Sequence, residues 1–137
     1  MRDKIYFAHH INIYNTKEEE FLEFIIENHF SEFDIENPNQ KKHSDGYRNY
    51  QGEGKRGMDY FFEEVLPDCK AGGICHPFED GMLGKGVFAE MNWLYNAKRN
   101  LWEISSEGII KELKELDTSR ELSVEETRKR VYPQGKK

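Results

Sequence analysis

A carboxylate stands in an apolar segment in the second half of the chain. Residues 86–90 read GVFAE and Met91 follows, so Glu90 has only glycine and apolar neighbours nearby. A buried carboxylate is costly unless it is paired, so Glu90 is either paired within the fold or part of a site. A second carboxylate, Asp80, lies in the loop upstream. If both reach one pocket, they can carry nucleophilic and acid–base chemistry.

Glycines lie around both carboxylates. Gly81 follows Asp80, and Gly86 opens the segment that leads to Glu90. Glycine lets the backbone approach a ligand closely, and a helix N-terminus offers free amide groups to an anion. We expect a helix to begin here, with Glu90 in its first turn and kept ionised by the helix dipole. A carboxylate in a first turn also occurs simply because it complements that dipole.

Strands and helices are predicted to alternate along the chain. Short β-favouring runs predict strands at 4–10, 32–38, 72–78 and 100–104. Apolar residues at helical spacing predict helices at 15–30, 58–69, 86–98, 105–116 and 123–132. Capping boxes at Thr16–Glu19 and Ser123–Glu126 support two of the helix starts.

This alternation predicts a single α/β domain over residues 1–137, with a mostly parallel sheet and helices on both faces. In such a sheet ligands bind beyond the carboxyl ends of the strands, which places the stretches AHH, NPN and HPFEDG at one edge. Residues 38–57 are predicted to be a long polar loop, either a lid or binding loop or a plain surface insertion. Residues 118–137 are expected to form a C-terminal helix and tail.

Charge and cysteine content argue against several classes of protein. The formal net charge of −6 makes a nucleic acid polymer an unsuitable partner, whereas a single nucleotide needs only a local anion site. No apolar run is long enough to span a membrane, and we expect no signal peptide. Cys69 and Cys75 form neither a CxxC pair nor a zinc pattern, so we expect reduced thiols, no cofactor and a cytoplasmic protein.

Three stretches, in this order, resemble the nucleoside 2-deoxyribosyltransferase family, which includes nucleotide N-glycoside hydrolases. They are YFA in the first predicted strand, the pattern DG....G...E formed by Asp80, Gly81, Gly86 and Glu90, and NLWEI as the following strand. The resemblance covers roughly residues 4–117. It implies a small flavodoxin-like, three-layer domain. It also implies an enzyme that cleaves or transfers at the N-glycosidic bond of a nucleoside or nucleotide.

The same resemblance implies roles for individual residues. Glu90 matches the nucleophile that attacks the anomeric carbon, and Asp80 matches an aspartate that binds sugar hydroxyls or assists proton transfer. Tyr6 matches an aromatic residue of the sugar pocket, and Gly81 and Gly86 belong to the substrate-binding loop. A carboxylate nucleophile forms a glycosyl ester while a second acid protonates the departing base. Because the family commonly looks oligomeric, a homodimer or larger homo-oligomer is expected.

The chain departs from the family pattern at two places. His9 and His10 stand where the family often has a small or glycine–proline turn, and Lys85 stands where it often has an acidic residue. These side chains suggest an anion site and a phosphorylated substrate, or a loss of the transferase activity. His76, at the end of the third predicted strand, is expected either to polarise a leaving base or to hydrogen-bond a loop carbonyl.

Two other functions fit the same residues. A metal-dependent hydrolase would use His9, His10, His76, Asp80 and Glu90 as ligands, although no HxH or HExxH spacing is present. A nucleotide-binding module would keep the fold and bind its ligand without turnover. The metal content of the protein and the release of free base distinguish these functions from a glycosidase.

Overall fold

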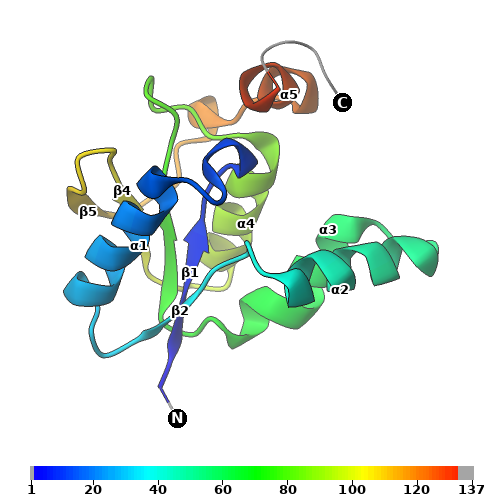
Figure 1. Cartoon of the computed structure of the whole chain (residues 1–137), viewed down its shortest axis with the longest axis horizontal. Helices are drawn as coiled ribbons and strands as arrows, with labels where there is room; N and C mark the ends of the chain where they lie inside the picture. The colour runs from blue at the N-terminus through cyan, green and yellow to red at the C-terminus, as the bar shows by residue number, and fades with distance from the viewer. Residues whose placement is uncertain (1, 133–137) are drawn as a thin grey trace.

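The computed structural model describes residues 2–132, which form an α/β structure around a five-stranded sheet (Figure 1). The strands are β1 (Lys4–Ala8), β2 (Asp34–Glu36), β3 (Gly72–Cys75), β4 (Leu101–Ile104) and β5 (Ile110–Leu113). Their order in the sheet is β2-β1-β3-β4-β5, and every pairing is parallel except that of β4 with β5. The predicted α/β class with a mostly parallel sheet is confirmed.

Within these residues the helices are α1 (Lys17–His29), α2 (Lys41–Gly52), α3 (Gly57–Tyr60), α4 (Lys85–Asn96) and α5 (Val124–Val131). Helical turns continue without a break from α3 to Asp68, so the helix predicted over 58–69 is confirmed. The helices predicted at 15–30, 86–98 and 123–132 are confirmed as α1, α4 and α5. None of the helices described here has the length and apolarity that a membrane span requires. The last five residues of the predicted tail, 133–137, lie outside the described residues.

Alternate residues of β1 pack into two separate hydrophobic clusters, as the strand period of two requires. Ile5 and Phe7 lie in a cluster with Leu22 and Ile26 of α1. Tyr6 and Ala8 lie in the other cluster, with α4 and the helical turns that follow α3. The strand therefore directs the Tyr6 side chain toward α4, the helix that carries Glu90.

The helix predicted over 105–116 is wrong, because β5 occupies this segment as an antiparallel partner of β4. A tight turn joins the two strands: the Gly108 amide donates to the Ser105 carbonyl, and Gly108 has a φ of 83°. Glycine adopts this left-handed conformation at little cost. Ile109, expected on the inner side of a helix, is 67% exposed. The spacing of apolar residues in IIKELKEL fits the period of a helix and also that of a strand. Pairing with β4 selects the strand.

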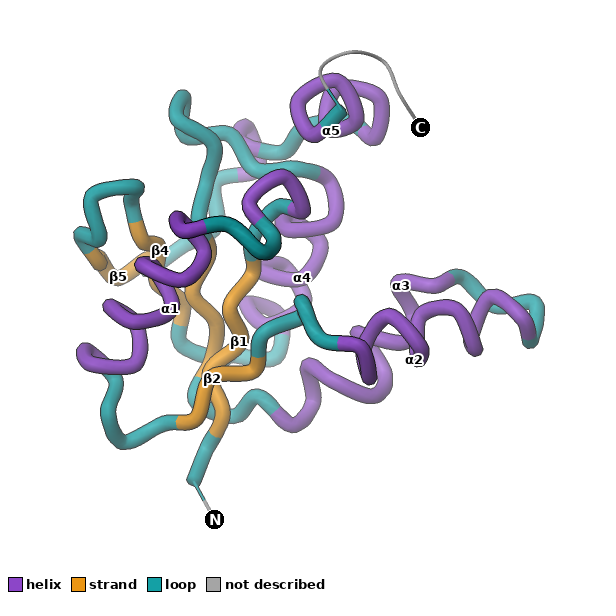
Figure 2. Tube along the Cα trace, viewed as in Figure 1, coloured by secondary structure: helices purple, strands orange, loops and turns teal. Residues whose placement is uncertain are grey.

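The prediction of a long loop over 38–57 is also wrong, because residues 41–52 form α2 and α3 begins at Gly57. Both helices extend away from the sheet as an arm (Figure 2). Glycines make their close crossing possible. A Cβ at Gly46 would overlap the ring of Tyr60, and a Cβ at Gly57 would overlap the ring of Tyr47. The glycines that indicated a loop in the sequence thus leave room for two tyrosine rings in the structure.

This crossing predicts opposite effects for two glycine substitutions in α2. Gly46→Ala is expected to destabilise the protein by about 1–3 kcal/mol, because the new methyl group must displace the Tyr60 ring. Gly52→Ala meets nothing within 4 Å and is expected to stabilise α2 by about 0.5 kcal/mol through helix propensity. Urea unfolding of both variants measures the difference. Equal effects of the two substitutions would contradict the crossing.

Candidate active site

A cavity of about 620 Å³ lies at the edge of the sheet where the parallel strands end. It lies between the loop after β1, the inner face of the α2–α3 arm, the beginning of α4, and α5. Glu90 is the only carboxylate among the described residues that line it. His9, His10 and Pro38 line it, so two of the three stretches that were predicted at this edge contribute to the cavity, and HPFEDG does not. We refer to it as the Glu90 cavity.

Glu90 lies in the second turn of α4 and is held by Tyr6. Because α4 begins at Lys85 with Gly84 as its N-cap, the prediction that Glu90 lies in the first turn is wrong. The Glu90 side chain is buried, and the hydroxyl of the fully buried Tyr6 donates a hydrogen bond to Glu90 Oε2 over 2.7 Å. The structure therefore brings together the predicted nucleophile and the predicted aromatic residue of the first strand.

Burial sets the charge of this pair. Loss of hydration raises the pKa of Glu90 to about 7, and the hydrogen bond from Tyr6 offsets only part of that rise. Burial therefore opposes the expected effect of the helix dipole, which was to keep Glu90 ionised. Burial, together with the nearby Glu90, raises the pKa of Tyr6 well above its usual value, so Tyr6 remains a donor.

The remaining walls of the Glu90 cavity are largely aromatic and apolar. Tyr14, Tyr47, Phe61, Met58 and Val131 line it. Such walls suit a flat, uncharged ring. Tyr14 and Phe61 were not predicted as site residues. The α2 residues could have been found from the four-residue spacing of His43 and Tyr47, which places both on one helix face.

His9 lines the same cavity, but neither of its ring nitrogens is available to a ligand. Nδ1 lies 2.9 Å from the Phe7 carbonyl and Nε2 lies 2.7 Å from Glu19 Oε2. The other oxygen of Glu19 accepts from the Asn15 amide, so only the Thr16 half of the predicted capping box forms. Although burial opposes it, these donors lower the pKa of Glu19. His9 therefore ties the loop after β1 to α1.

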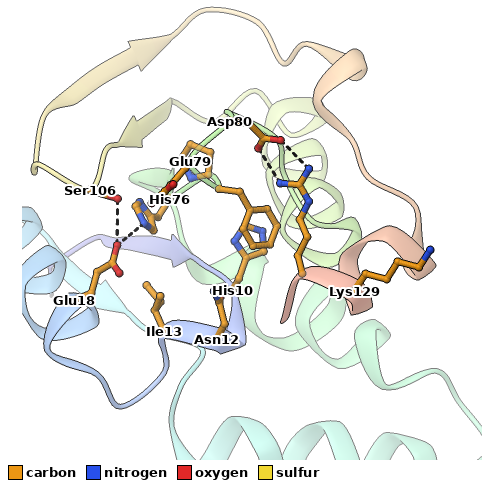
Figure 3. Close-up of a pocket in the computed structure, with 12 residues that line it drawn as sticks. His10, Asn12, Ile13, Glu18, His76, Glu79, Asp80, Ser106 and Lys129 are labelled. Carbon is orange, nitrogen blue, oxygen red and sulfur yellow. Dashed lines mark hydrogen bonds and ion pairs between the residues drawn. The ribbon is translucent and has the colours of Figure 1, made fainter. Parts of the chain in front are cut away.

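His76 lines a second cavity, of about 700 Å³, rather than the Glu90 cavity (Figure 3). Its Nδ1 lies 2.8 Å from the Ile104 carbonyl, and its Nε2 lies 3.1 Å from Glu18 Oε2. Ser106 donates to the same Glu18 oxygen over 3.3 Å. His76 thus has a carbonyl partner, as one of the two expectations stated, but this carbonyl belongs to the last residue of β4 and not to a loop.

Asp80 also lines the second cavity, so the expectation that it shares a pocket with Glu90 is wrong. Its two carboxylate oxygens accept from Arg130 of α5 at 2.9 and 2.7 Å (Figure 3). This partner lowers the pKa of Asp80 to about 2. The neighbouring Gly81 has a φ of 87°, and its carbonyl accepts from Arg120 over 2.7 Å. Both residues of the DG turn therefore fasten the C-terminal segment to the body of the protein.

The predicted anion site of His9, His10 and Lys85 does not form. The Lys85 ammonium lies 2.7 Å from Glu121 Oε2, and Lys85 does not line the Glu90 cavity. Gly86 does line it, and a Cβ at Gly86 would meet nothing within 4 Å, so the backbone is open to a ligand there. Arg48 of α2 is the cation that lines this cavity instead. The sequence could not predict that Arg48 and Gly86, which are far apart along the chain, line the same cavity.

The predicted metal ligands are also dispersed. Among residues 2–132, no three His, Cys, Asp or Glu side chains are arranged so that they could hold a metal ion. Cys69 and Cys75 are free and buried, as predicted for reduced thiols. Burial raises the pKa of each thiol to about 12, so neither is a reactive thiolate at neutral pH.

The Glu90 pKa predicts a pH-dependent stability. Because the folded value of about 7 lies above the usual 4.5, this group favours the folded state below pH 4.5. That contribution is lost as the pH rises through 7, a change of up to about 3 kcal/mol. Glu90→Gln keeps an acceptor for Tyr6 but cannot ionise. Its thermal midpoint should match that of the parent at pH 5 and exceed it by several degrees at pH 8.5. A constant difference across this range would contradict the burial argument.

The Asp80–Arg130 pair predicts a weakly fastened α5. None of the residues of α5 is buried, so polar contacts hold much of the helix in place. Asp80→Asn should increase amide hydrogen exchange in residues 124–131 by about two- to fivefold, which is the usual worth of a partly exposed ion pair. Lys129→Gln is the matched control, because among residues 2–132 the ion pair of Lys129 is with Glu125 of its own helix. Equal exchange in both variants would show that this pair does not hold α5.

Of the predicted site residues, His9, His10, Gly86 and Glu90 line this cavity and Tyr6 contacts Glu90, whereas Asp80, Gly81, Lys85 and His76 do not line it. The cavity combines one buried carboxylate of pKa about 7 with a tyrosine donor, aromatic walls and a single arginine. In comparisons with known proteins, no family model, curated protein or solved structure matches this chain.

Proposed function

We propose that this protein cleaves, or transfers at, the N-glycosidic bond of a nucleoside or nucleoside monophosphate, with Glu90 as the nucleophile. The observation that carries the proposal is the Glu90 carboxylate itself. It is buried at an aromatic cavity, and the Tyr6 hydroxyl holds one of its oxygens at 2.7 Å. Of the residues that carry the resemblance, Gly86 and Glu90 line this cavity and Tyr6 contacts Glu90, whereas Asp80 and Gly81 do not line it. A three-layer, flavodoxin-like arrangement forms part of this proposal.

In the proposed reaction, the ionised carboxylate of Glu90 attacks the anomeric carbon of the sugar. The carbon–nitrogen bond breaks, and the base leaves with the electron pair and takes up a proton from water. Water or an acceptor hydroxyl then displaces Glu90 from the glycosyl ester and restores the carboxylate. Tyr6 orients the attacking carboxylate and favours its ionised form through the hydrogen bond.

The aromatic walls provide a place for the base. Tyr14, Tyr47 and Phe61 line the cavity and can contact the faces or edges of a flat heterocycle. Arg48 lies at the same cavity with most of its side chain exposed, and it pairs with Asp45 over 3.3 Å, so a substrate phosphate would share this cation with Asp45. We also propose a cytoplasmic protein that acts on small soluble nucleosides or nucleotides as a homodimer or larger homo-oligomer.

A second candidate is a nucleotide-binding module without turnover. One observation favours it: Glu90 is the only carboxylate lining the cavity in the described part of the chain, whereas Asp80 is paired with Arg130 elsewhere. The departing base then has no second acid within the cavity to protonate it. This module would bind nucleotides and release no free base.

The test is a chromatographic screen of nucleosides and their monophosphates for free base. The parent protein should release base, with a rate that rises with pH through about 7 as Glu90 ionises. Glu90→Gln should lower the rate on the order of a thousandfold or more while keeping substrate affinity. Glu27→Gln, the same change at an exposed residue of α1, should leave the rate unaltered. Base release that persists in folded Glu90→Gln would overturn the nucleophile, and binding without release by the parent would favour the module.

A further inference from the structure

His10 differs from the other buried histidines in its hydrogen bonding. His9, His43 and His76 each have polar partners at both ring nitrogens. His10 is equally buried, with 6% of its surface exposed, yet only its Nε2 has a partner within residues 2–132. Its Nδ1 is not among the fully enclosed polar atoms that lack a partner, so this nitrogen is accessible from a cavity that His10 lines.

The partner of His10 fixes which nitrogen carries the proton. The Gly84 backbone amide donates to His10 Nε2 over 2.9 Å. A nitrogen that accepts a hydrogen bond carries no proton, so the imidazole is neutral and its proton lies on Nδ1. Burial, followed by the nearby His76, His9 and Arg130, lowers the pKa of His10 to about 3. The ring therefore stays neutral at physiological pH and offers one donor.

The packing around His10 determines where this donor points. The Cδ2–Nε2 edge of the ring faces Gly84, since a Cβ there would lie 2.9 Å from Cδ2 and 3.0 Å from Nε2. One face of the ring stacks on Phe78, with centroids 3.8 Å apart and planes 13° from parallel. The Nδ1–Cε1 edge and the other face remain. Phe78 lines only the second cavity whereas His10 lines both, so the uncovered edge of the ring is within reach of a molecule bound in the Glu90 cavity.

We propose that His10 is a ligand-recognition residue of the Glu90 cavity, donating its Nδ1–H to an oxygen acceptor of the bound molecule. The acceptor is a phosphate oxygen or a carbonyl oxygen, since a neutral imidazole fixed in this tautomer cannot accept a hydrogen bond at Nδ1. Gly86 and Val87, at the N-terminal end of α4, line the same cavity and also favour an electron-rich oxygen there. This inference rests on the Glu90 cavity as the proposed substrate site, but it does not require turnover.

The contacts behind His10 keep the donor in place. His10 stacks on Phe78, and the Arg130 guanidinium lies over the Phe78 ring, 5.1 Å from its centroid. Arg130 is in turn paired with Asp80. The Gly84 amide that fixes the tautomer belongs to the N-cap of α4, the helix that carries Glu90. The recognition donor and the proposed nucleophile are thus positioned by the same helix.

The tautomer can be measured without a ligand. In a nitrogen NMR spectrum of ring-labelled histidines, His10 should show a protonated Nδ1 and an unprotonated Nε2 from pH 5 to 8. A proton on Nε2, or a doubly protonated ring at pH 6, would overturn the proposal. Thymidine and thymidine 5′-monophosphate, whose base carries carbonyl oxygens, are added separately as probes. The His10 Nδ1 resonance should shift with the monophosphate alone if a phosphate oxygen is the acceptor, and with both if another oxygen is. No shift with either probe would overturn the recognition role.

Two variants separate recognition from packing. Asn places its amide nitrogen near the position of Nδ1, whereas Gln places its amide oxygen near that of Nε2. His10→Gln should therefore keep the Gly84 contact and the thermal midpoint but weaken probe binding by about tenfold, the usual effect of one lost hydrogen bond. His10→Asn should bind the probe more tightly than His10→Gln, even if it is less stable. Equal binding by the parent and His10→Gln would contradict the proposal. Probe binding without base release would remove the proposed glycosidase activity and leave this inference standing.

Discussion

The hydrogen bond between Tyr6 and Glu90 joins β1, an inner strand of the sheet, to α4, the helix that packs on it. Both side chains are buried, so the carboxylate has lost its hydration and depends on the tyrosine hydroxyl for compensation. This pairing requires that β1 present Tyr6, and not Phe7, toward α4, which the alternation of a strand provides. Burial also raises the pKa of Glu90 to about 7, and the chemistry proposed for the cavity requires its ionised form.

The α2–α3 arm supplies the wall opposite Glu90. Its two helices cross closely because Gly46 and Gly57 leave room for the rings of Tyr60 and Tyr47. His43, one turn before Tyr47, bridges Glu36 at the end of β2 and the Tyr60 hydroxyl, at 2.6 and 2.8 Å. The arm is therefore fixed to the edge of the sheet by a buried polar contact as well as by packing. A segment with little apolar content still forms a wall of the cavity, because its few aromatic residues face inward.

The C-terminal segment closes the site from another side. Thr127 and Val131 of α5 line the Glu90 cavity, while Lys129 and Arg130 line the second cavity. The Lys85 amide donates to the Thr127 hydroxyl over 2.8 Å, so this segment contacts the first residue of α4 directly. Asp80, which looked like a catalytic group in sequence, serves the attachment of α5 through Arg130. His10 lies between the two cavities, and its ring is the element shared by both.

The sequence by itself determined the α/β class, the ends of α1, α4 and α5 to within a few residues, and the burial of Glu90, because apolar periodicity and capping residues act locally. It did not determine β5, since the spacing of Ile109, Ile110 and Leu113 fits a helix or a strand and only pairing with β4 selects one. Nor did it place Asp80 or Lys85, whose partners Arg130 and Glu121 lie 50 and 36 positions away along the chain. Such pairs form only after the chain has folded. Only the tertiary structure decided which carboxylate faces the cavity, because burial and ion pairing depend on neighbours that are distant in sequence. The sequence by itself shows only which residues are able to form ion pairs or to be buried.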